Sequence, residues 1–369
     1  MQRRDFIKTM AAAGAISAVG RYAHAVPQGW REFEIAYSIT LKDAAPPARL
    51  WVPVPQDALD YQRVVDLGWR STVPTSVLWE GMSRAPIVSA AWLESTSATE
   101  VEITARVMTR DRSSFYPDAT REELSEYLRP SPSSPTDGIV LEKAQEIVGP
   151  RTAPLEKARA IYDWVVDNTF RRPDTRGCGL GNVAFMLRSG DLGGKCADIN
   201  SLYVALTRAA GLPARDFFGI RVADSKVSKS LGKSGDITKA QHCRAEVFIE
   251  RKGWFPVDPA DVRKVVLEEQ VPLDSDKVKG LRERLFGSWE MNWVGSTMPR
   301  LHLAGPEERA DRLFDVSLRR NLGRQPGFAR SGRLRLCNIV KGDRMGRFER
   351  LAAVMARRID WRRYRTNPS

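Results

Sequence analysis

The run Gly193-Gly194-Lys195-Cys196-Ala197-Asp198 stands directly before a long amphipathic segment, and the rest of the chain is best understood from this junction. The segment places five apolar residues at helical spacing: Ile199, Leu202, Tyr203, Leu206 and Ala210. Gly211-Leu212-Pro213 then ends the predicted helix. At the first turn of a buried helix, unpaired backbone N–H groups and the positive end of the dipole stabilise a thiolate. Cys196 is therefore a candidate nucleophile, with Gly194 allowing close backbone approach and the free Cys196 N–H facing a developing oxyanion.

A predicted strand pair supplies the partners that a catalytic thiolate needs. From His242 the sequence alternates, and the apolar positions are predicted to face a core: Cys243, Ala245, Val247 and Ile249. His242 then lies on the other face, and a turn leads from this strand into Trp254-Phe255-Pro256-Val257-Asp258. A hairpin of this length brings Asp258 beside His242, where a carboxylate fixes the imidazole tautomer and stabilises its cation. We predict that Cys196 is the nucleophile, His242 its base and Asp258 the group that orients the histidine.

A structural role is the alternative to a catalytic one for Cys196 and for two acidic residues, one near it in the sequence and one on the predicted strand of His242. A cysteine at a helix start, taken alone, is more often a small buried residue than a nucleophile, and only the ordered strands change this balance for Cys196. Asp198 is expected to satisfy the helix N-terminus rather than to act in catalysis. Glu246 shares the predicted face of His242 but sits further along the strand, so Asp258 is the better partner.

The four cysteines, Cys178, Cys196, Cys243 and Cys337, form no C-x-x-C pair. Cys243 is expected in the core or in a disulfide, for which Cys178 is the partner to test. A zinc site built from Cys178, Cys196 and His242 lacks the ligand spacing of zinc motifs, so neither a metal nor another cofactor is expected.

Four ordered blocks, within a match over about residues 157–264, resemble the core of the transglutaminase-like superfamily. These blocks are residues 194–198, 206–215, 242–246 and 253–259. The resemblance implies an α+β fold with a papain-like core, in which the helix N-terminus that carries the cysteine packs on an antiparallel sheet. It also implies that the catalytic cysteine, histidine and aspartate of the family correspond to Cys196, His242 and Asp258.

Two positions depart from the family pattern. Arg244 stands where many members carry an aromatic residue, and Lys195 stands where a small or apolar residue is commoner. Arg244 and Trp254 are therefore candidate substrate contacts, and an ion pair with Glu246 is the alternative role of Arg244.

The start of the chain resembles a twin-arginine export signal. Arg3-Arg4 precede a short apolar run, residues 10–19, and the small-residue motif Ala23-His24-Ala25. About ten apolar residues cannot span a hydrocarbon core of roughly 30 Å, so a signal peptide over residues 1–25 is predicted rather than a membrane helix. We expect the mature chain in the periplasm or outside the cell; the alternative is a chance arginine pair before an amphipathic helix.

Two domains are predicted after the signal. Residues 26–129 alternate in short runs broken by Pro and Gly, which is typical of a β-sandwich-like domain. The catalytic domain spans residues 139–294, with Thr152 as the cap of its first helix. The polar stretch 224–239 is predicted to be an exposed loop, and a lid over the site is its alternative role.

The basic character of the chain belongs to its last part, residues 295–369. Of the formal net charge of +13, residues 296–369 hold +11, from seventeen Arg and one Lys against seven acidic residues. The rest of the chain therefore lacks the basic character that is typical of nucleic-acid binding, and the tail is a candidate contact for anionic surfaces. Apart from a predicted helix at 347–359 the tail has no steady period, which suggests either a shifted reading frame or a genuine basic appendage.

Together these features predict an exported thiol enzyme that acts on amide bonds of protein or peptide through an acyl-enzyme. Hydrolysis, including that of cell-wall peptide, is the first choice. Acyl transfer to an amine, as in protein crosslinking, is the alternative. A second alternative is not an enzyme but a binding module that keeps the fold without catalysis.

Overall fold

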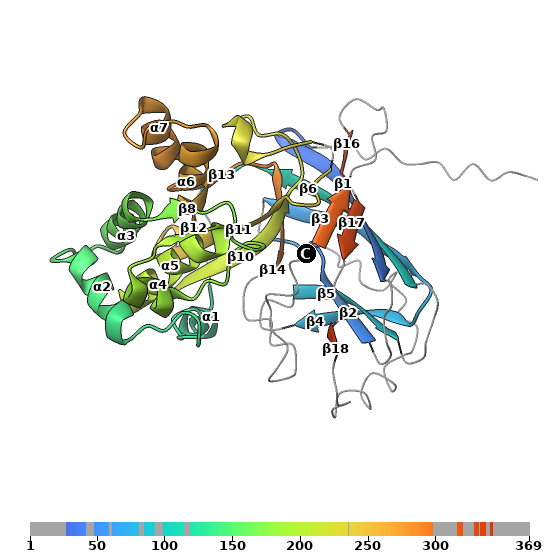
Figure 1. Ribbon diagram of the computed structural model, residues 1–369, viewed down its shortest axis with the longest axis horizontal. Coiled ribbons are helices and arrows are strands. Elements are labelled where there is room, and N and C mark those ends of the chain that lie inside the picture. The colour runs from blue at the N-terminus through green and yellow to red at the C-terminus, as the bar shows by residue number, and fades with distance from the viewer. Residues whose placement is uncertain are drawn as a thin grey trace, which may run out of the picture.

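The computed structural model describes residues 27–41, 48–58, 61–80, 85–92, 99–113, 119–234 and 236–297, and the backbone of four short strands between 316 and 341. Figure 1 shows two bodies side by side, a helix-rich one and one made of strands. None of the described helices is long and apolar enough to cross a membrane. The predicted export signal, Cys337 and the helix predicted at 347–359 lie outside the described residues.

The N-terminal body is a β-sandwich, as predicted. Its strands are β1 (Trp30–Leu41), β2 (Ala48–Pro53), β3 (Gln62–Ser71), β4 (Thr75–Glu80), β5 (Ala85–Trp92) and β6 (Thr99–Arg110). One sheet contains β1, β6 and β3 and the other contains β2, β5 and β4. Alternate residues of each strand point inward, because successive side chains of a strand face opposite sides. On β1 these fully buried residues are Phe33, Ile35, Tyr37 and Ile39.

The second body carries all seven helices of the described chain. They are α1 (Arg121–Glu126), α2 (Gly138–Val148), α3 (Pro154–Asn168), α4 (Val183–Ser189), α5 (Cys196–Ala209), α6 (Pro259–Glu268) and α7 (Asp276–Arg284), with a 3₁₀ turn at Lys229–Leu231. Its strands are β8 (Phe170–Arg171), β9 (Gly193–Gly194), β10 (Ala214–Arg221), β11 (Gln241–Ile249), β12 (Gly253–Val257) and β14 (Trp293–Thr297). Two short strands, β7 (Arg112–Ser113) and β13 (Ser288–Trp289), pair with each other where the two bodies meet.

The central antiparallel sheet has the strand order β12-β11-β10-β14, and α5 packs against β11. The apolar face of α5 predicted from helical spacing is buried, including Ile199, Leu202 and Tyr203. Burying a side chain of the size of Leu or Ile contributes roughly 1.5–3 kcal/mol, so this face contributes several kcal/mol to holding the helix in the core. The α+β, papain-like arrangement expected from the sequence is thus present.

The polar stretch 224–239 differs from its prediction as an exposed loop. Its 3₁₀ turn buries Leu231, and Ile237 is also fully buried. The Asn292 side chain donates hydrogen bonds to the carbonyls of Ala223 and Leu231, at 3.3 and 3.1 Å. This segment is therefore anchored to the body at several points rather than solvated throughout.

Two other local predictions need correction or extension. The helix α3 begins at Pro154 with Ala153 in the cap position, one residue after the predicted cap Thr152. The C-terminal segment, for which no strand period was found, contains β15 (Val316–Arg319), β16 (Phe328–Ser331), β17 (Arg333–Leu336) and β18 (Val340–Lys341). β16 pairs with β1 and β18 with β2, so this segment adds a strand to each sheet of the sandwich.

Candidate active site

Cys196 is the first residue of α5, and its neighbours explain why the helix begins there. The Asp198 carboxylate accepts backbone N–H hydrogen bonds of 2.9 Å each from Lys195, Leu180 and Gly181. This acceptor role at the helix start is the one predicted for Asp198. Gly194 is required because a Cβ built on it would lie 2.4 Å from the Asp198 side chain. The backbone N–H of Cys196 has no intrahelical acceptor, since no helical residue precedes it by four positions.

Three thiols converge at this point. The sulfur atoms of Cys178, Cys196 and Cys243 all lie within 4.8 Å of one another, and the three side chains are free and buried. The two that belong to α5 and β11, Cys196 and Cys243, are 4.0 Å apart. Cys178 and Cys243, the pair to be tested for a disulfide, are close to each other but are both free thiols in this structure.

His242 and Asp258 lie in direct contact. The Nε2 atom of His242 is 2.7 Å from Asp258 Oδ2, and both side chains are fully buried. His242 lies on β11, and Asp258 follows β12 and caps α6 by accepting the N–H of Asp261 at 3.1 Å. The predicted hairpin therefore brings the two residues together. The other ring nitrogen, Nδ1, is buried and has no hydrogen-bond partner among the described residues.

Two further polar residues complete the cluster and were missed in the sequence. Asp261 Oδ2 lies 3.3 Å from His242 Nε2 and also pairs with Arg221. The Asn200 amide donates to the Cys243 carbonyl at 2.7 Å and lies 3.4 Å from Asp258 Oδ1. Both could have been found from spacing, because Asn200 is four residues after Cys196 on the same helix face and Asp261 is three after the capping aspartate.

Arg244 does not have either of its predicted roles. It is only 3% exposed, its Nε lies 3.4 Å from Asp258 Oδ2, and it donates to the Glu290 carbonyl at 3.2 Å. Its guanidinium also lies over the rings of Trp289 and Trp293. The Arg244 guanidinium thus lies beside the Asp258 carboxylate, and this cation stands where many family members carry an aromatic residue.

Glu246 and Trp254 also lie away from the cluster. Glu246 is fully buried and pairs with Arg112 and Arg215 instead of with Arg244. Trp254 is 3% exposed, and the Arg215 guanidinium stacks 3.8 Å from its ring centre. In this structure neither Arg244 nor Trp254 presents a surface to a substrate.

The electrostatics of the cluster favour an ion pair between the thiol and the imidazole. Hydrogen bonds from Cys178 and Cys243, together with His242, hold the pKa of the Cys196 thiol well below its usual value despite burial. Burial and the Arg221 charge work against an imidazolium, but the Asp258 and Asp261 carboxylates outweigh them and raise the pKa of His242 to about 9. Burial raises the pKa of the Cys243 thiol well above its usual value. Of these three thiols, Cys196 is therefore the one that ionises most readily.

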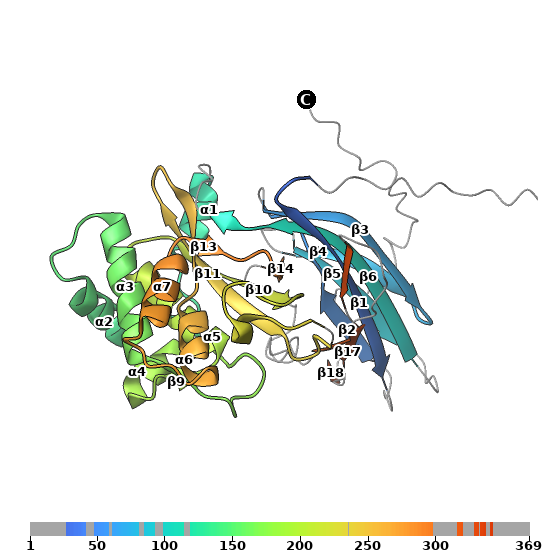
Figure 2. The same cartoon turned by 90° about the horizontal axis from the view of Figure 1, so that it is seen from above.

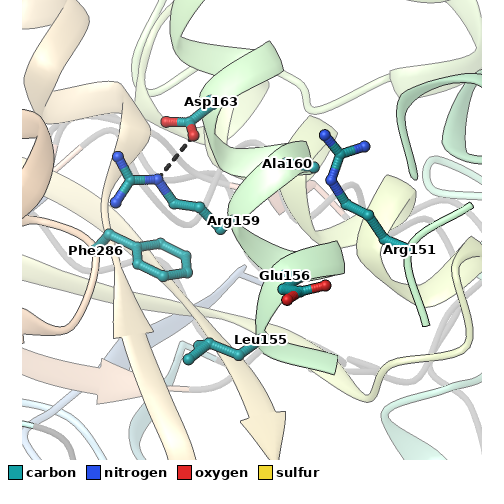
Figure 3. Close-up of a pocket in the computed structure, with 7 residues that line it drawn as sticks. All are labelled: Arg151, Leu155, Glu156, Arg159, Ala160, Asp163 and Phe286. Carbon is teal, nitrogen blue, oxygen red and sulfur yellow. Dashed lines mark hydrogen bonds and ion pairs between the residues drawn. The ribbon is translucent and has the colours of Figure 1, made fainter. Parts of the chain in front are cut away.

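A hollow beside α3 and Phe286 contains none of the predicted site residues (Figure 3). Two of its charged side chains are paired with each other, since Arg159 bonds Asp163 at 2.8 Å, and Arg159 also bonds Glu283. This hollow is therefore separate from the candidate active site.

This chain is similar in sequence or in structure to several known proteins. The family model for the transglutaminase-like superfamily matches residues 142–259. An uncharacterized protein of Haemophilus influenzae is 35% identical over 320 residues, which cover 78% of this chain and 86% of that protein. Among solved structures, a proposed cysteine protease from Cytophaga hutchinsonii has 18% identity and a TM-score of 0.49, covering 73% of this chain and 82% of that one. The periplasmic domain of TgpA from Pseudomonas aeruginosa has 17% identity and a TM-score of 0.35, covering 68% and 86%.

Proposed function

Since this chain belongs to the transglutaminase-like superfamily, we propose that it is a thiol enzyme acting on amide bonds of protein or peptide through an acyl-enzyme on Cys196. The observation that carries the proposal is the junction of α5 with the β11–β12 hairpin. There a thiol of depressed pKa at a helix start adjoins a histidine that lies 2.7 Å from a buried aspartate.

The proposed reaction begins with the Cys196 thiolate and the His242 imidazolium. The thiolate attacks the amide carbonyl, and the backbone N–H of Cys196 donates to the oxyanion that forms. Because Asp258 occupies Nε2, Nδ1 of His242 is the nitrogen that gives its proton to the departing amine. Water, deprotonated at the same nitrogen, then hydrolyses the thioester and restores the thiolate. An amine in place of water would give acyl transfer, the alternative outcome.

The first test is labelling with an acyl electrophile followed by peptide mapping, with and without a primary amine. We expect the adduct on Cys196, whereas Cys178 and Cys243, whose pKa values are raised, serve as internal controls that stay unmodified. A Cys196→Ala variant should show no labelling. Turnover independent of the amine would indicate a hydrolase, and an amine-linked product would indicate a transferase. A Cys196 that reacts no faster than an ordinary cysteine would leave the binding-module alternative.

Two exposed apolar side chains next to the Cys196 loop are the substrate contacts we propose in place of Arg244 and Trp254. Phe170 is 44% exposed and precedes Arg171 on β8, which pairs with the Gly193–Gly194 strand. Leu180 is 72% exposed, and its N–H bonds Asp198. Exposed apolar groups held beside a reactive thiol suit the side chains of a peptide.

A Leu180→Ser variant tests this contact. We expect its KM for an apolar peptide substrate to rise severalfold while the rate of Cys196 labelling stays unchanged, because the thiol itself is untouched. Phe185→Ser on α4, at a residue of 62% exposure, is the matched surface control. Equal KM values in all three proteins would exclude Leu180 as a substrate contact.

We also propose that the protein is exported by the twin-arginine route, on the basis of Arg3-Arg4 and the apolar run that follows. Replacing both arginines with lysine should retain the precursor in the cytoplasm, as cell fractionation would show. Export of the variant at the normal level would exclude this route.

A further inference from the structure

Two thiols next to the proposed nucleophile form no covalent bond to the substrate and carry no proton in the reaction above. Cys178 is 6% exposed and Cys243 is 1% exposed, and each lies within 4.8 Å of the other and of Cys196, sulfur to sulfur. We propose that Cys178, Cys196 and Cys243 together bind one soft, thiophilic metal ion, Cu(I), and that the bound ion blocks the nucleophile.

The spacing of the sulfur atoms fits a three-coordinate ion. With a metal–sulfur bond of about 2.3 Å, three sulfurs in a plane around one ion lie about 4.0 Å apart. Cys196 and Cys243 already have this separation, 4.0 Å. Because no two of the three sulfurs are more than 4.8 Å apart, a shift of less than about 1 Å would bring Cys178 to the same separation. The ion can therefore enter with little rearrangement.

The donor set favours Cu(I) over zinc. Soft thiolate ligands select Cu(I), and zinc in protein sites takes four ligands. Among the described residues, the groups close enough to share one ion are the three cysteines and, separately, His242 with Asp258 and Asp261. No such group combines His242 with the thiols, so a zinc ion here would have to take water as its fourth ligand, whereas three-coordinate Cu(I) needs none.

Each donor is held in place by backbone hydrogen bonds. The Cys178 carbonyl accepts the N–H of Ala197 at 2.9 Å, which ties its loop to the start of α5. The Cys243 carbonyl accepts from Asn200 at 2.7 Å, which ties β11 to the same helix. Ligands fixed in this way lose little freedom when an ion binds, and this favours a specific site over chance proximity.

The surroundings also suit an anionic metal–thiolate centre. Binding displaces the protons of Cys178 and Cys243 to solvent, so the three thiolates and Cu(I) carry a net charge of minus two. The Arg221 cation lies near enough to act on Cys178 and the His242 cation near enough to act on Cys196, and the two positive charges would offset this charge. Inhibition by the ion rests on the proposed function, whereas binding itself does not.

The test is an anaerobic titration of the full chain with Cu(I) against a chromogenic Cu(I) chelator. We expect the wild type to hold one Cu(I) ion tightly. Cys178→Ser and Cys243→Ser should each bind Cu(I) at least about 10–100-fold more weakly, because even the loss of a residue that only hydrogen-bonds a metal ligand costs this much affinity. Cys337→Ser, at the fourth cysteine of the sequence, is the matched thiol control and should bind as the wild type does. Equal affinity in all four proteins would overturn the proposal.

X-ray absorption of the wild-type Cu(I) complex gives a second measurement that does not depend on whether the variants fold. Three sulfur ligands are expected; two sulfurs, or nitrogen and oxygen ligands, would overturn the site. Inhibition is read separately, as activity recovered when the chelator removes Cu(I). If the titration and spectrum succeed but the protein has no amidase or transferase activity, the proposed function fails and the metal site stands.

Discussion

His242 lies between two carboxylates with different partners. Asp261 also pairs with Arg221, and, although burial opposes ionisation, the Arg221 and His242 cations hold the pKa of this aspartate well below its usual value. Asp258 is in closer contact with the imidazole, but burial and the nearby Asp261 charge raise its pKa. Both carboxylates thus raise the pKa of His242, and Asp258 also supplies the short hydrogen bond that orients the ring.

Replacing Asp258 with asparagine separates these contributions. Because the pKa of His242 is raised to about 9, its imidazolium is present below that pH and is lost above it, so wild-type turnover should fall as pH rises through about 9. In Asp258→Asn we expect this alkaline limb to move toward the ordinary histidine pKa of about 6.5. Turnover should fall by about 10²–10⁴-fold, the usual contribution of a positioned acid or base.

The measurement is the pH profile of kcat/KM, with Asp276→Asn on the exposed surface of α7 as control. The control should keep the wild-type limb. An Asp258→Asn enzyme whose limb stays at about 9 would show that Asp261 alone sets the histidine pKa.

At the scale of elements, the start of α5 depends on close contact between the glycine strand β9 and Asp198. A methyl group added at Gly194 would lie 2.4 Å from the Asp198 side chain, which holds three backbone N–H groups. We expect Gly194→Ala to lower the free energy of unfolding by about 1–3 kcal/mol, as overpacking usually does, and to slow the labelling of Cys196.

Gly280 in α7 is the matched glycine, because a Cβ there meets nothing within 4 Å. Alanine is the better helix former, so Gly280→Ala should raise the free energy of unfolding by up to about 1 kcal/mol and leave labelling unchanged. Urea unfolding measures both variants. A destabilised Gly280→Ala, or a Gly194→Ala protein as stable as the wild type, would contradict this account of the two sites.

The elements around Cys196 could be predicted from sequence because their signals are local. The helical period after Cys196 and the alternation after His242 gave α5 and β11 to within about two residues, and hairpin geometry brought Asp258 to His242. The anchoring of residues 224–239 could not be predicted, because it depends on Asn292 and other residues distant in sequence. The burial of Arg244 escaped for the same reason, since its contacts with Trp289 and Trp293 come from a later segment.

For the whole molecule, Arg112 joins the end of the sandwich to the central antiparallel sheet of the helix-rich body. It donates to the Trp254 carbonyl at 2.7 Å, pairs with Glu246 on β11, and lies over the rings of Tyr61 and Trp289. Burial lowers its pKa to about 10, which leaves it charged at neutral pH. Apolar residues of both bodies also share one core, so the two should unfold together.

Removing this arginine tests whether the two bodies form one cooperative unit. In Arg112→Ala we expect a loss of about 3 kcal/mol, the low end for deleting one partner of a buried ion pair, because Arg215 still contacts Glu246. Urea unfolding followed by tryptophan fluorescence and by far-ultraviolet circular dichroism should give one transition, shifted equally in both signals. Arg70→Ala, at an exposed position of β3, should leave the midpoint within about 0.5 kcal/mol of wild type. Two separate transitions in the wild type, with only one displaced in Arg112→Ala, would show that the sandwich and the helix-rich body fold independently and that Arg112 stabilises only one of them.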